Sequence, residues 1–110
     1  MPARIVVISG SPGTGKTTIS RILAENSTHE KAVYIEVDDF WQYIRKGYIH
    51  PWEGGGGAGN QNETVIESAA ASAKRFSEGG YEVFVFQHIY FSLYKLSVEK
   101  FDKLGFILYG

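Results

Sequence analysis

The 110-residue sequence contains no cysteine, and it has no long hydrophobic run. Without cysteine the chain forms no disulfide framework and offers no thiolate to a metal. None of its apolar stretches approaches the roughly 18 residues that a membrane-spanning helix needs. The apolar stretch near the N-terminus has no basic region of its own in front of it, unlike a signal peptide. These absences predict a soluble, cytoplasmic protein that does not bind a membrane.

Neither sign of charge is in clear excess. Eleven Lys and Arg residues stand against twelve Asp and Glu residues, which gives a formal net charge of -1. Such a balance provides no general attraction to nucleic acid or to an anionic surface, so neither is expected as a partner. The length suits one domain with a single hydrophobic core over residues 1–110. The composition does not indicate an oligomeric state.

The most informative motif lies near the N-terminus, where residues 3–18 read ARIVVISGSPGTGKTT. Its glycines, lysine and threonine fit the pattern G-x-x-x-x-G-K-[ST]. Glycines let the backbone turn so that successive N–H groups surround phosphate oxygens at the start of a helix. Lys16 would then reach the β- and γ-phosphates, and the Thr17 hydroxyl would bind Mg²⁺. The motif predicts ATP and Mg²⁺ as cofactors, with a nucleotide site made by Gly10, Ser11, Gly13, Thr14, Gly15, Lys16, Thr17 and Thr18.

The residues on both sides of this motif provide the structural context that it requires. Residues 5–8 form a continuous apolar run, typical of a strand that is buried on both faces of a parallel sheet. After the motif, Ile19, Ile22 and Leu23 recur at helical spacing, which predicts a helix from Gly15 or Lys16 to about Asn26. A glycine-rich turn that only joins a strand to a helix is the alternative, and this context makes it the weaker one.

The rest of the chain predicts further strands and helices. Residues 32–37 and 81–86 read as strands, residues 91–104 as a helix and residues 106–109 as a fourth strand. A short helix with one apolar face is expected after residue 39, from Phe40, Trp41, Tyr43 and Ile44. A second, longer helix is expected from Asn62, as its N-cap, to Gly79. Its inward-facing stripe would consist of Val65, Ile66, Ala69, Ala70, Ala73 and Phe76.

Residues 47–61 contain six glycines and a proline, which predicts a flexible glycine-rich loop inside the domain. A loop of this length in a compact domain is either functional or disordered. We interpret it as a mobile segment that covers a substrate, with a disordered excursion as the alternative.

The order of these elements predicts an α/β fold, a three-layer sandwich with a parallel sheet whose strands are joined by right-handed crossovers. Its predicted core consists of Ile5, Val7, Ile19, Leu23, Ile35, Val37, Ile66, Ala70, Val83 and Val85.

Two carboxylates, Asp38 and Asp39, follow the predicted strand of residues 32–37. In open parallel α/β sheets, ligands bind outside the carboxyl ends of the strands. We expect this strand to end beside the phosphate loop, where one carboxylate would act as a general base or as a water-mediated partner of Mg²⁺. The alternative is that both residues begin a helix, whose positive end favours acidic side chains. Lys16, Asp38 and Asp39 are therefore the catalytic candidates.

The motifs together resemble the small P-loop kinases of the adenylate-kinase-like group, and the chain is similar to gluconate kinases, zeta-toxin-type kinases and chloramphenicol phosphotransferase. The segments ISGSPGTGKTT, EVDDFW, HPW and NQNETVIE carry the resemblance, which covers residues 3–85 approximately. It implies a P-loop NTPase fold, Mg²⁺ at Thr17, and an ATP-dependent kinase that phosphorylates a hydroxyl of a small molecule. In this group a catalytic carboxylate follows the second strand, here residues 32–37. It maps onto Asp38 or, with a shift of one residue, onto Asp39. The stretch 40–52 would contact the acceptor.

The sequence departs from this group in two places. Members usually carry an acidic residue at the end of the next strand, where this chain has Phe86, Gln87 and His88. They also continue through further elements, including an arginine-bearing lid, whereas the sequence given ends at Gly110.

Two other functions fit the motif. A nucleotide-binding switch or GTPase would carry N-K-x-D, and the nearest string here is EKFD at residues 99–102. A remnant that binds nucleotide without turnover would also retain the phosphate loop. The sequence does not identify the acceptor.

Several other side chains have both a functional and a structural interpretation. The aromatic residues around the glycine loop either pack in the core or a lid, or stack on an organic acceptor: Trp41, Tyr43, Tyr48 and Trp52. The basic residues are solvated surface charges or phosphate ligands: Arg21, Arg45, Lys46, Lys74 and Arg75. His50 and His88 lack spaced partners, so no histidine metal site is expected.

Overall fold

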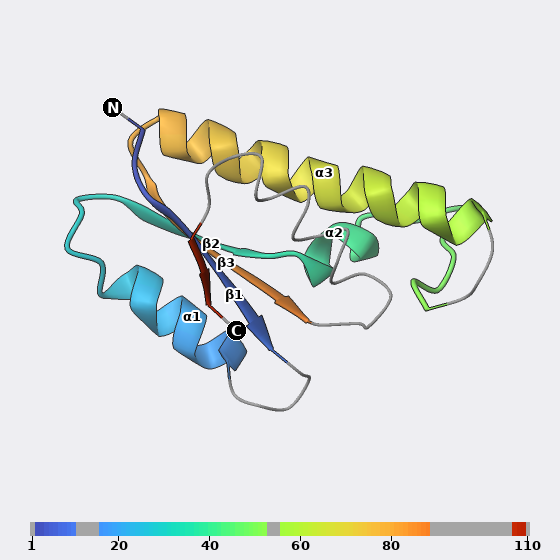
Figure 1. The fold of residues 1–110 in the computed structure, drawn as a ribbon, viewed down its shortest axis with the longest axis horizontal. Helices are drawn as coiled ribbons and strands as arrows, with labels where there is room; N and C mark the ends of the chain where they lie inside the picture. Colours follow the sequence, from blue (N-terminus) through green and yellow to red (C-terminus); the bar gives the residue numbers. More distant parts are fainter. Residues whose placement is uncertain (1, 11–15, 53–55, 89–106, 110) are drawn as a thin grey trace.

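A parallel sheet forms the centre of the molecule in the computed structural model, which describes residues 2–10, 16–52, 56–88 and 107–109 (Figure 1). Its strands are β1 (Ile5–Gly10), β2 (Ala32–Glu36), β3 (Glu82–His88) and β4 (Ile107–Tyr109). They lie in the order β2-β3-β1-β4, and every neighbouring pair is parallel. The predicted strands and the parallel arrangement are confirmed. The predicted helix over 91–104 lies outside the described residues.

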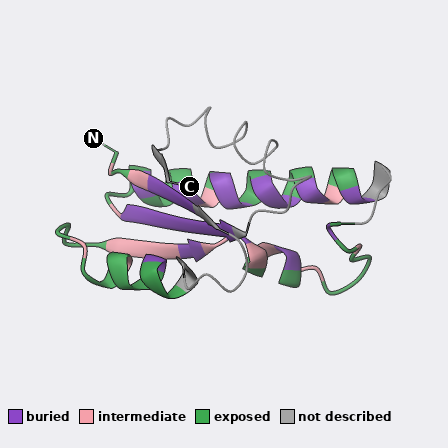
Figure 2. Ribbon diagram, turned by 60° about the horizontal axis from the view of Figure 1, so that its bottom comes forward, coloured by how far each residue is buried: buried purple, intermediate pink, exposed green. Residues whose placement is uncertain are grey.

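Helices cover both faces of the sheet, which gives the three layers expected of this fold class. Helix α1 (Lys16–Glu25) lies on one face, and α2 (Asp38–Gln42) and α3 (Gly56–Glu78) lie on the other (Figures 1 and 2). The larger core cluster joins the sheet to α2 and α3, and a smaller cluster occupies the face toward α1. The strands β1, β2 and β3 therefore contribute alternate side chains to two separate cores.

The strand order corrects the expectation that the second strand ends beside the first. β3 lies between them, and its register with β1 places Gln87 opposite Ser9 and His88 opposite Gly10. Burial explains the order. Residues 82–87 of β3 are buried throughout, as a central strand requires, whereas β2 has only Ile35 fully buried and suits an edge.

Most of the predicted core is confirmed, with seven of its members buried: Val7, Ile35, Val37, Ile66, Ala70, Val83 and Val85. Ile5 is partly buried and packs against the larger cluster. The prediction was wrong for Ile19 and Leu23, which are 52% and 43% exposed.

Helix α1 packs on the sheet through small side chains, which leaves its larger apolar side chains exposed. Ser20 is completely buried, and Ala24 packs against the smaller core cluster. These two residues are four apart and so share one helical face, which lets α1 approach the sheet closely. The prediction also failed for Phe76 on α3, which is 42% exposed.

Helix α3 begins earlier than predicted, at Gly56, so the glycine-rich loop does not extend over residues 56–61. Asn62 is therefore not an N-cap. It lies within the helix, 3% exposed, and its side-chain amide bonds Trp41 and the Pro51 backbone. The sequence suggested a cap because asparagine favours helix starts. Here the same polar groups are used in a tertiary contact.

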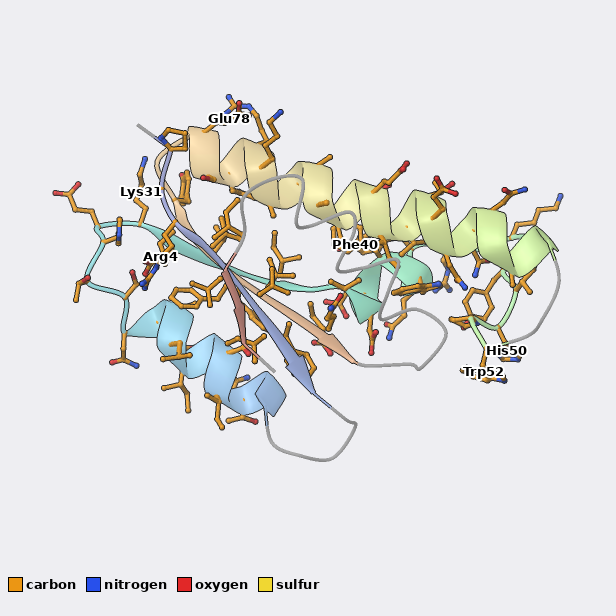
Figure 3. All side chains as sticks on the ribbon, viewed as in Figure 1. Arg4, Lys31, Phe40, His50, Trp52 and Glu78 are labelled. Atoms are coloured by element: carbon orange, nitrogen blue, oxygen red, sulfur yellow. The ribbon has the colours of Figure 1, made fainter. Side chains whose placement is uncertain are left out.

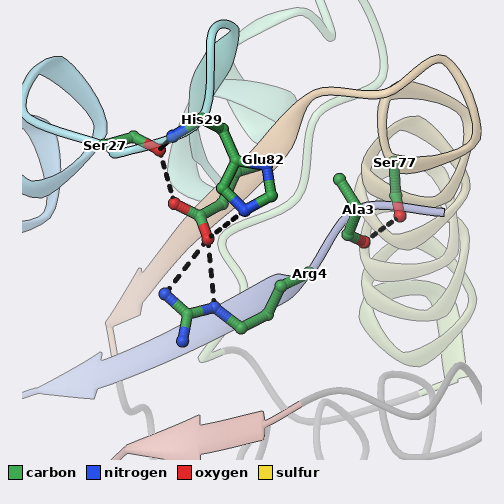
Figure 4. Close-up of polar contacts among 6 residues, drawn as sticks. All are labelled: Ala3, Arg4, Ser27, His29, Ser77 and Glu82. Atoms are coloured by element: carbon green, nitrogen blue, oxygen red, sulfur yellow. Dashed lines mark hydrogen bonds and ion pairs between the residues drawn. The ribbon is translucent and has the colours of Figure 1, made fainter. Parts of the chain in front are cut away.

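The buried carboxylate of Glu82 holds together the chain segments at the amino-terminal ends of the strands. Glu82 accepts bonds from Arg4 Nε at 3.1 Å and from Ser27 Oγ at 2.6 Å, and its carboxylate lies 3.3 Å from His29 Nε2 (Figure 4). Nearby, the Ser77 hydroxyl donates to the Ala3 carbonyl. These contacts join four parts of the chain: the segment before β1, the α1–β2 connection, α3 and β3. They lie at the amino-terminal ends of the strands, far from the end of β1 at Gly10.

Candidate functional site

The phosphate-loop motif lies between the end of β1 at Gly10 and the start of α1 at Lys16, as its mechanism requires. Four of the predicted binding residues lie outside the described residues: Ser11, Gly13, Thr14 and Gly15. For Lys16 and Thr17 the structure describes the backbone, at the first turn of α1, and not the side chains. Thr18 follows in the same turn and is exposed.

The start of α1 suits a phosphate anion. Its first turn contains no acidic residue, so no carboxylate neutralises the positive end of the helix dipole. By contrast, the first turn of α2 carries Asp38 and Asp39. The residue types in the α1 turn, an ammonium and hydroxyls, are also those that bind phosphate and Mg²⁺. The described part of the motif therefore fits a nucleotide with its metal.

The neighbour of the β1 end is the end of β3. Gln87 and His88 lie opposite Ser9 and Gly10, and the Gln87 side chain is buried. From the sequence, Gln87 and His88 stood where related kinases carry an acidic residue, and His88 also counted as a histidine without spaced partners. Their polar character directly after a buried apolar run is the signal that would have put them next to the phosphate loop.

Asp38 and Asp39 follow the carboxyl-terminal end of β2, on the same side of the sheet as the phosphate loop. The strand β3 lies between β2 and β1, so both residues are one strand further from the loop than Gln87 and His88. Neighbouring strands are about 4.8 Å apart, so β2 ends roughly 10 Å from β1 across the sheet. Both residues stand in the first turn of α2, and Val37 before them makes no side-chain cap. The helix-dipole interpretation of both carboxylates is thus satisfied.

The two carboxylates face different cavities. Asp38 lines a cavity of about 140 Å³ whose other walls are Trp41, Gln42, Tyr48, Pro51 and Trp52. Asp39 lines a separate cavity of about 370 Å³ between α2, α3 and β2. The sequence could not separate these neighbours, because their directions depend on how α2 packs.

Aromatic rings make up much of the Asp38 cavity and its rim. The His50 ring stacks on Trp52 with centroids 4.7 Å apart, and Tyr48 meets His50 edge-on at 5.5 Å. His50 and Trp52 lie at the end of the molecule away from Arg4 and Lys31 (Figure 3). The Trp52 side chain is 62% exposed. Of the four aromatic residues singled out, Trp41 is therefore a core residue, while Tyr48 and Trp52 present ring surface beside a carboxylate.

Residues of α3 hold this aromatic segment in place. Gln61 accepts a bond from Ile49 N–H at 2.8 Å and donates to the Ile49 carbonyl at 2.6 Å. Asn62 donates to the Pro51 carbonyl at 3.0 Å and accepts from Trp41 Nε1 at 2.9 Å. The sequence analysis missed both roles, because it placed Gln61 in a loop and Asn62 at a helix cap.

A tyrosine lies beside the Asp39 cavity. The Tyr34 hydroxyl donates to a Glu36 carboxylate oxygen at 3.2 Å. Burial raises the pKa of Tyr34 well above its ordinary value, and the negative charges of Glu36 and Asp39 raise it further. The phenol therefore stays protonated and acts as a donor.

The predicted phosphate ligands do not gather at the phosphate loop. Lys74 and Arg75 lie near the end of α3, just before β3 begins. They are therefore near the amino-terminal ends of the strands, whereas Gly10 is at the carboxyl-terminal end of β1. Arg21 is exposed and lies 3.8 Å from Glu25, one turn along the same helix. Arg45 and Lys46 are exposed in the segment after α2.

Two general features of the described residues bear on ligands and location. No three His, Cys, Asp or Glu side chains there are grouped so that they could hold a metal ion. No helix in this part of the chain is both long and apolar enough to cross a membrane.

Comparison with known proteins supports the motif. Residues 2–49 match the family described as "Novel STAND NTPase 3" (nSTAND3), a span that runs from β1 through α2. This match supports a nucleotide-binding NTPase domain. It covers less than half of the chain. No curated protein matches in sequence.

A solved structure described as "Crystal structure of APE1195" has a similar fold. The TM-score is 0.62 at 20% sequence identity, over 97% of this chain and 57% of that chain. The present chain thus spans little more than half the length of that protein. Taken with the strand–motif–helix arrangement of β1 and α1, these findings identify the chain as an α/β protein with the P-loop NTPase fold.

Proposed function

We propose that the chain belongs to a Mg²⁺-dependent ATP phosphotransferase that phosphorylates a hydroxyl group of a small molecule. The observation that carries this proposal is the Asp38 carboxylate in the wall of a small aromatic cavity. The cavity lies at the carboxyl edge of the sheet, where α/β proteins bind ligands. Because β3 separates this cavity from the end of β1, the cavity suits the acceptor molecule, whereas the nucleotide would bind at the phosphate loop.

In this proposal each group has a distinct task. When bound, ATP with Mg²⁺ supplies the phosphoryl group and neutralises part of its charge. Lys16 binds phosphate oxygens, and the Thr17 hydroxyl holds the metal. Asp38 accepts the proton of the acceptor hydroxyl. Trp52 and Tyr48 offer ring faces to the carbon skeleton of the acceptor. Asp39, which lines a different cavity, is not the base.

The second candidate function is hydrolysis of the nucleotide, which the NTPase family match favours. The same carboxylate would then orient water in place of an alcohol. A third candidate is binding of nucleotide without turnover, which needs only the phosphate loop. Neither candidate requires the aromatic surface at Tyr48 and Trp52.

The fate of the γ-phosphate distinguishes these functions. We would incubate the chain with γ-labelled ATP, Mg²⁺ and a panel of sugars, nucleosides and aminoglycoside-like alcohols, and then separate the labelled products. A labelled phosphate ester that disappears in Asp38→Asn supports the phosphotransferase. Labelled inorganic phosphate in every reaction, with no ester, would assign the chain to the NTPases. An unchanged pool of labelled ATP would indicate binding without turnover.

A further inference from the structure

β2 has a free edge with an outward row of backbone hydrogen-bonding groups. In the described part of the chain, β2 pairs with β3 alone. On that side, the Lys31 carbonyl accepts from Glu82 N–H at 3.0 Å. Likewise, Val37 N–H donates to the Phe86 carbonyl at 2.9 Å. Because backbone groups alternate sides along a strand, the odd-numbered residues here face β3. The outward N–H and C=O groups belong to Ala32, Tyr34 and Glu36.

A groove with aromatic walls runs beside this edge. It consists of three cavities of about 460, 370 and 470 Å³ that share their walls. Ser72 and Phe76 line the first and second, and Phe40 and Tyr43 line the second and third. Phe76 and Tyr43 are 42% and 68% exposed. We call this feature the β2-edge groove.

The two ends of the edge carry opposite charges. Lys31 immediately precedes β2, and Arg75 lines the cavity at that end. Glu36 ends β2, and Asp39 follows it in α2. Lys31 and Phe40, the neighbour of Asp39, lie far apart along the molecule in Figure 3. Lys31 Nζ lies 4.4 Å from the centre of the Tyr81 ring, which lines the same cavity as Arg75. Glu30, which precedes Lys31, does not line the groove. The groove is therefore basic where the strand begins and acidic where it finishes.

We propose that a second copy of this chain binds at the β2 edge, with the two β2 strands antiparallel in one continuous sheet. A two-fold axis perpendicular to the sheet at Tyr34 places Tyr34 opposite its own copy, and Ala32 opposite Glu36. Each of the three outward residues of one copy then lies opposite an outward residue of the other copy. Each such pair forms two backbone N–H···O=C hydrogen bonds. The same axis keeps both α3 helices on one face of the sheet, so the two β2-edge grooves come together.

The charges favour this occupant over a strand from an unrelated protein. In the antiparallel arrangement, Lys31 of each copy meets the end of β2 that carries Glu36 and Asp39 in the other. Opposite charges near an edge contact stabilise it, and the two-fold axis provides that contact twice. A parallel arrangement would bring like charges together at both ends. The edge is thus complementary to itself in hydrogen bonding, and the β2-edge groove is complementary to itself in charge.

Sedimentation of the full 110-residue chain tests the proposal. We expect a reversible monomer–dimer equilibrium that Lys31→Glu shifts toward monomer, with the dissociation constant raised by roughly tenfold or more, or about 1.4 kcal/mol. Combining Lys31→Glu with Glu36→Lys and Asp39→Lys exchanges the two ends and should restore the dimer. Lys74→Glu makes the same charge change at an exposed residue that does not line the β2-edge groove, and it should leave the equilibrium unchanged.

A backbone variant tests the register independently. Ala32→Pro removes an outward amide without removing a bond to β3, because proline is tolerated at the first residue of an edge strand. Circular dichroism would establish that this variant is folded, and it should sediment as a monomer. If Ala32→Pro does not fold, Lys31→Glu alone decides, because that side chain is exposed. A wild-type chain that stays monomeric up to roughly 1 mM would overturn the proposal. A dimer that persists in Lys31→Glu would also overturn it.

Discussion

Trp41 Nε1 donates a hydrogen bond of 2.9 Å to Asn62 Oδ1, and both side chains are buried between α2 and α3. This contact ties the helix that carries Asp38 to the helix that holds residues 49–51 through Asn62 and Gln61. It therefore determines where the carboxylate stands relative to Tyr48 and Trp52. The shape of the candidate acceptor site depends on a residue that would never touch the acceptor.

Asn62→Ala should lower the free energy of unfolding by about 1–3 kcal/mol, since it leaves the buried Trp41 N–H without its acceptor. Chemical denaturation measures this loss. Trp41→Phe removes the donor instead, and the double variant should be more stable than the sum of the two losses predicts, by roughly 1 kcal/mol. Strict additivity would show that the bond makes no net contribution.

The same variant has a functional consequence that stability alone would not produce. With Asn62→Ala, the KM for the acceptor should rise while the affinity for ATP stays unchanged, because the phosphate loop lies beyond β3. Ser68→Ala, on the exposed side of α3, is the matched control. Equal weakening of ATP binding would mean that Asn62 supports the whole domain rather than the acceptor site.

Asp38→Asn should reduce turnover by about 10² to 10⁴ with little change in ATP affinity, because in the proposed reaction it removes the general base. Asp39→Asn should have a much smaller effect, since Asp39 lines a different cavity. Steady-state kinetics of both variants gives the comparison. A larger loss in Asp39→Asn would transfer the role of base to that residue. Small, equal losses would mean that both carboxylates serve only the start of α2.

Thr17→Val keeps the shape of the side chain and deletes its hydroxyl. The gain in ATP affinity on adding Mg²⁺ should therefore shrink, because the proposed protein ligand of the metal is lost. Calorimetric titrations with and without Mg²⁺ measure this gain. Thr64→Val removes an exposed hydroxyl of α3 and provides the control. An unchanged Mg²⁺ dependence in Thr17→Val would reduce Thr17 to a helix-start residue.

Tyr34 should remain protonated at a pH at which free tyrosine ionises, because its pKa is raised by burial and by Glu36. Its contribution to folding stability is then constant below about pH 10 and falls as the pH rises further. Absorbance titration at alkaline pH detects tyrosinate. In the folded state, Tyr34→Phe should titrate like the wild type up to roughly pH 11. In denaturant, the wild type should show one tyrosinate more. A difference of one tyrosinate in the folded state would contradict this assignment.

The sequence predicted the fold well where one signal dominated. The phosphate-loop motif predicted a strand before it and a helix that starts at Gly15 or Lys16, and α1 does start at Lys16. The strand β1 extends two residues beyond the apolar run of residues 5–8, to Gly10. Continuous apolar runs identified the central strands. Their order was predicted incorrectly, since strand order depends on which strands must be buried on both faces, as β3 is here.

The candidate site was less predictable, because its geometry depends on contacts between distant residues. Asn62 has the same local signature as a helix cap, and only its bonds to Trp41 and Pro51 reveal its role. Ile19 and Leu23 follow a helical period, yet the close approach of Ser20 to the sheet turns them outward. Nothing in local spacing distinguishes Asp38 from Asp39.

Binding of ATP to Lys16→Ala and to the wild type, compared by calorimetry, tests the central claim that residues 10–18 bind nucleotide phosphates. The Lys16 ammonium is the cation that the motif places beside the β- and γ-phosphates, and its loss removes charge-assisted hydrogen bonds. We predict that ATP affinity falls by roughly tenfold or more, or about 1.4 kcal/mol, while the circular dichroism spectrum is unchanged. Lys46→Ala, at an exposed lysine after α2, should bind like the wild type. Equal ATP affinity in Lys16→Ala and the wild type would contradict the account.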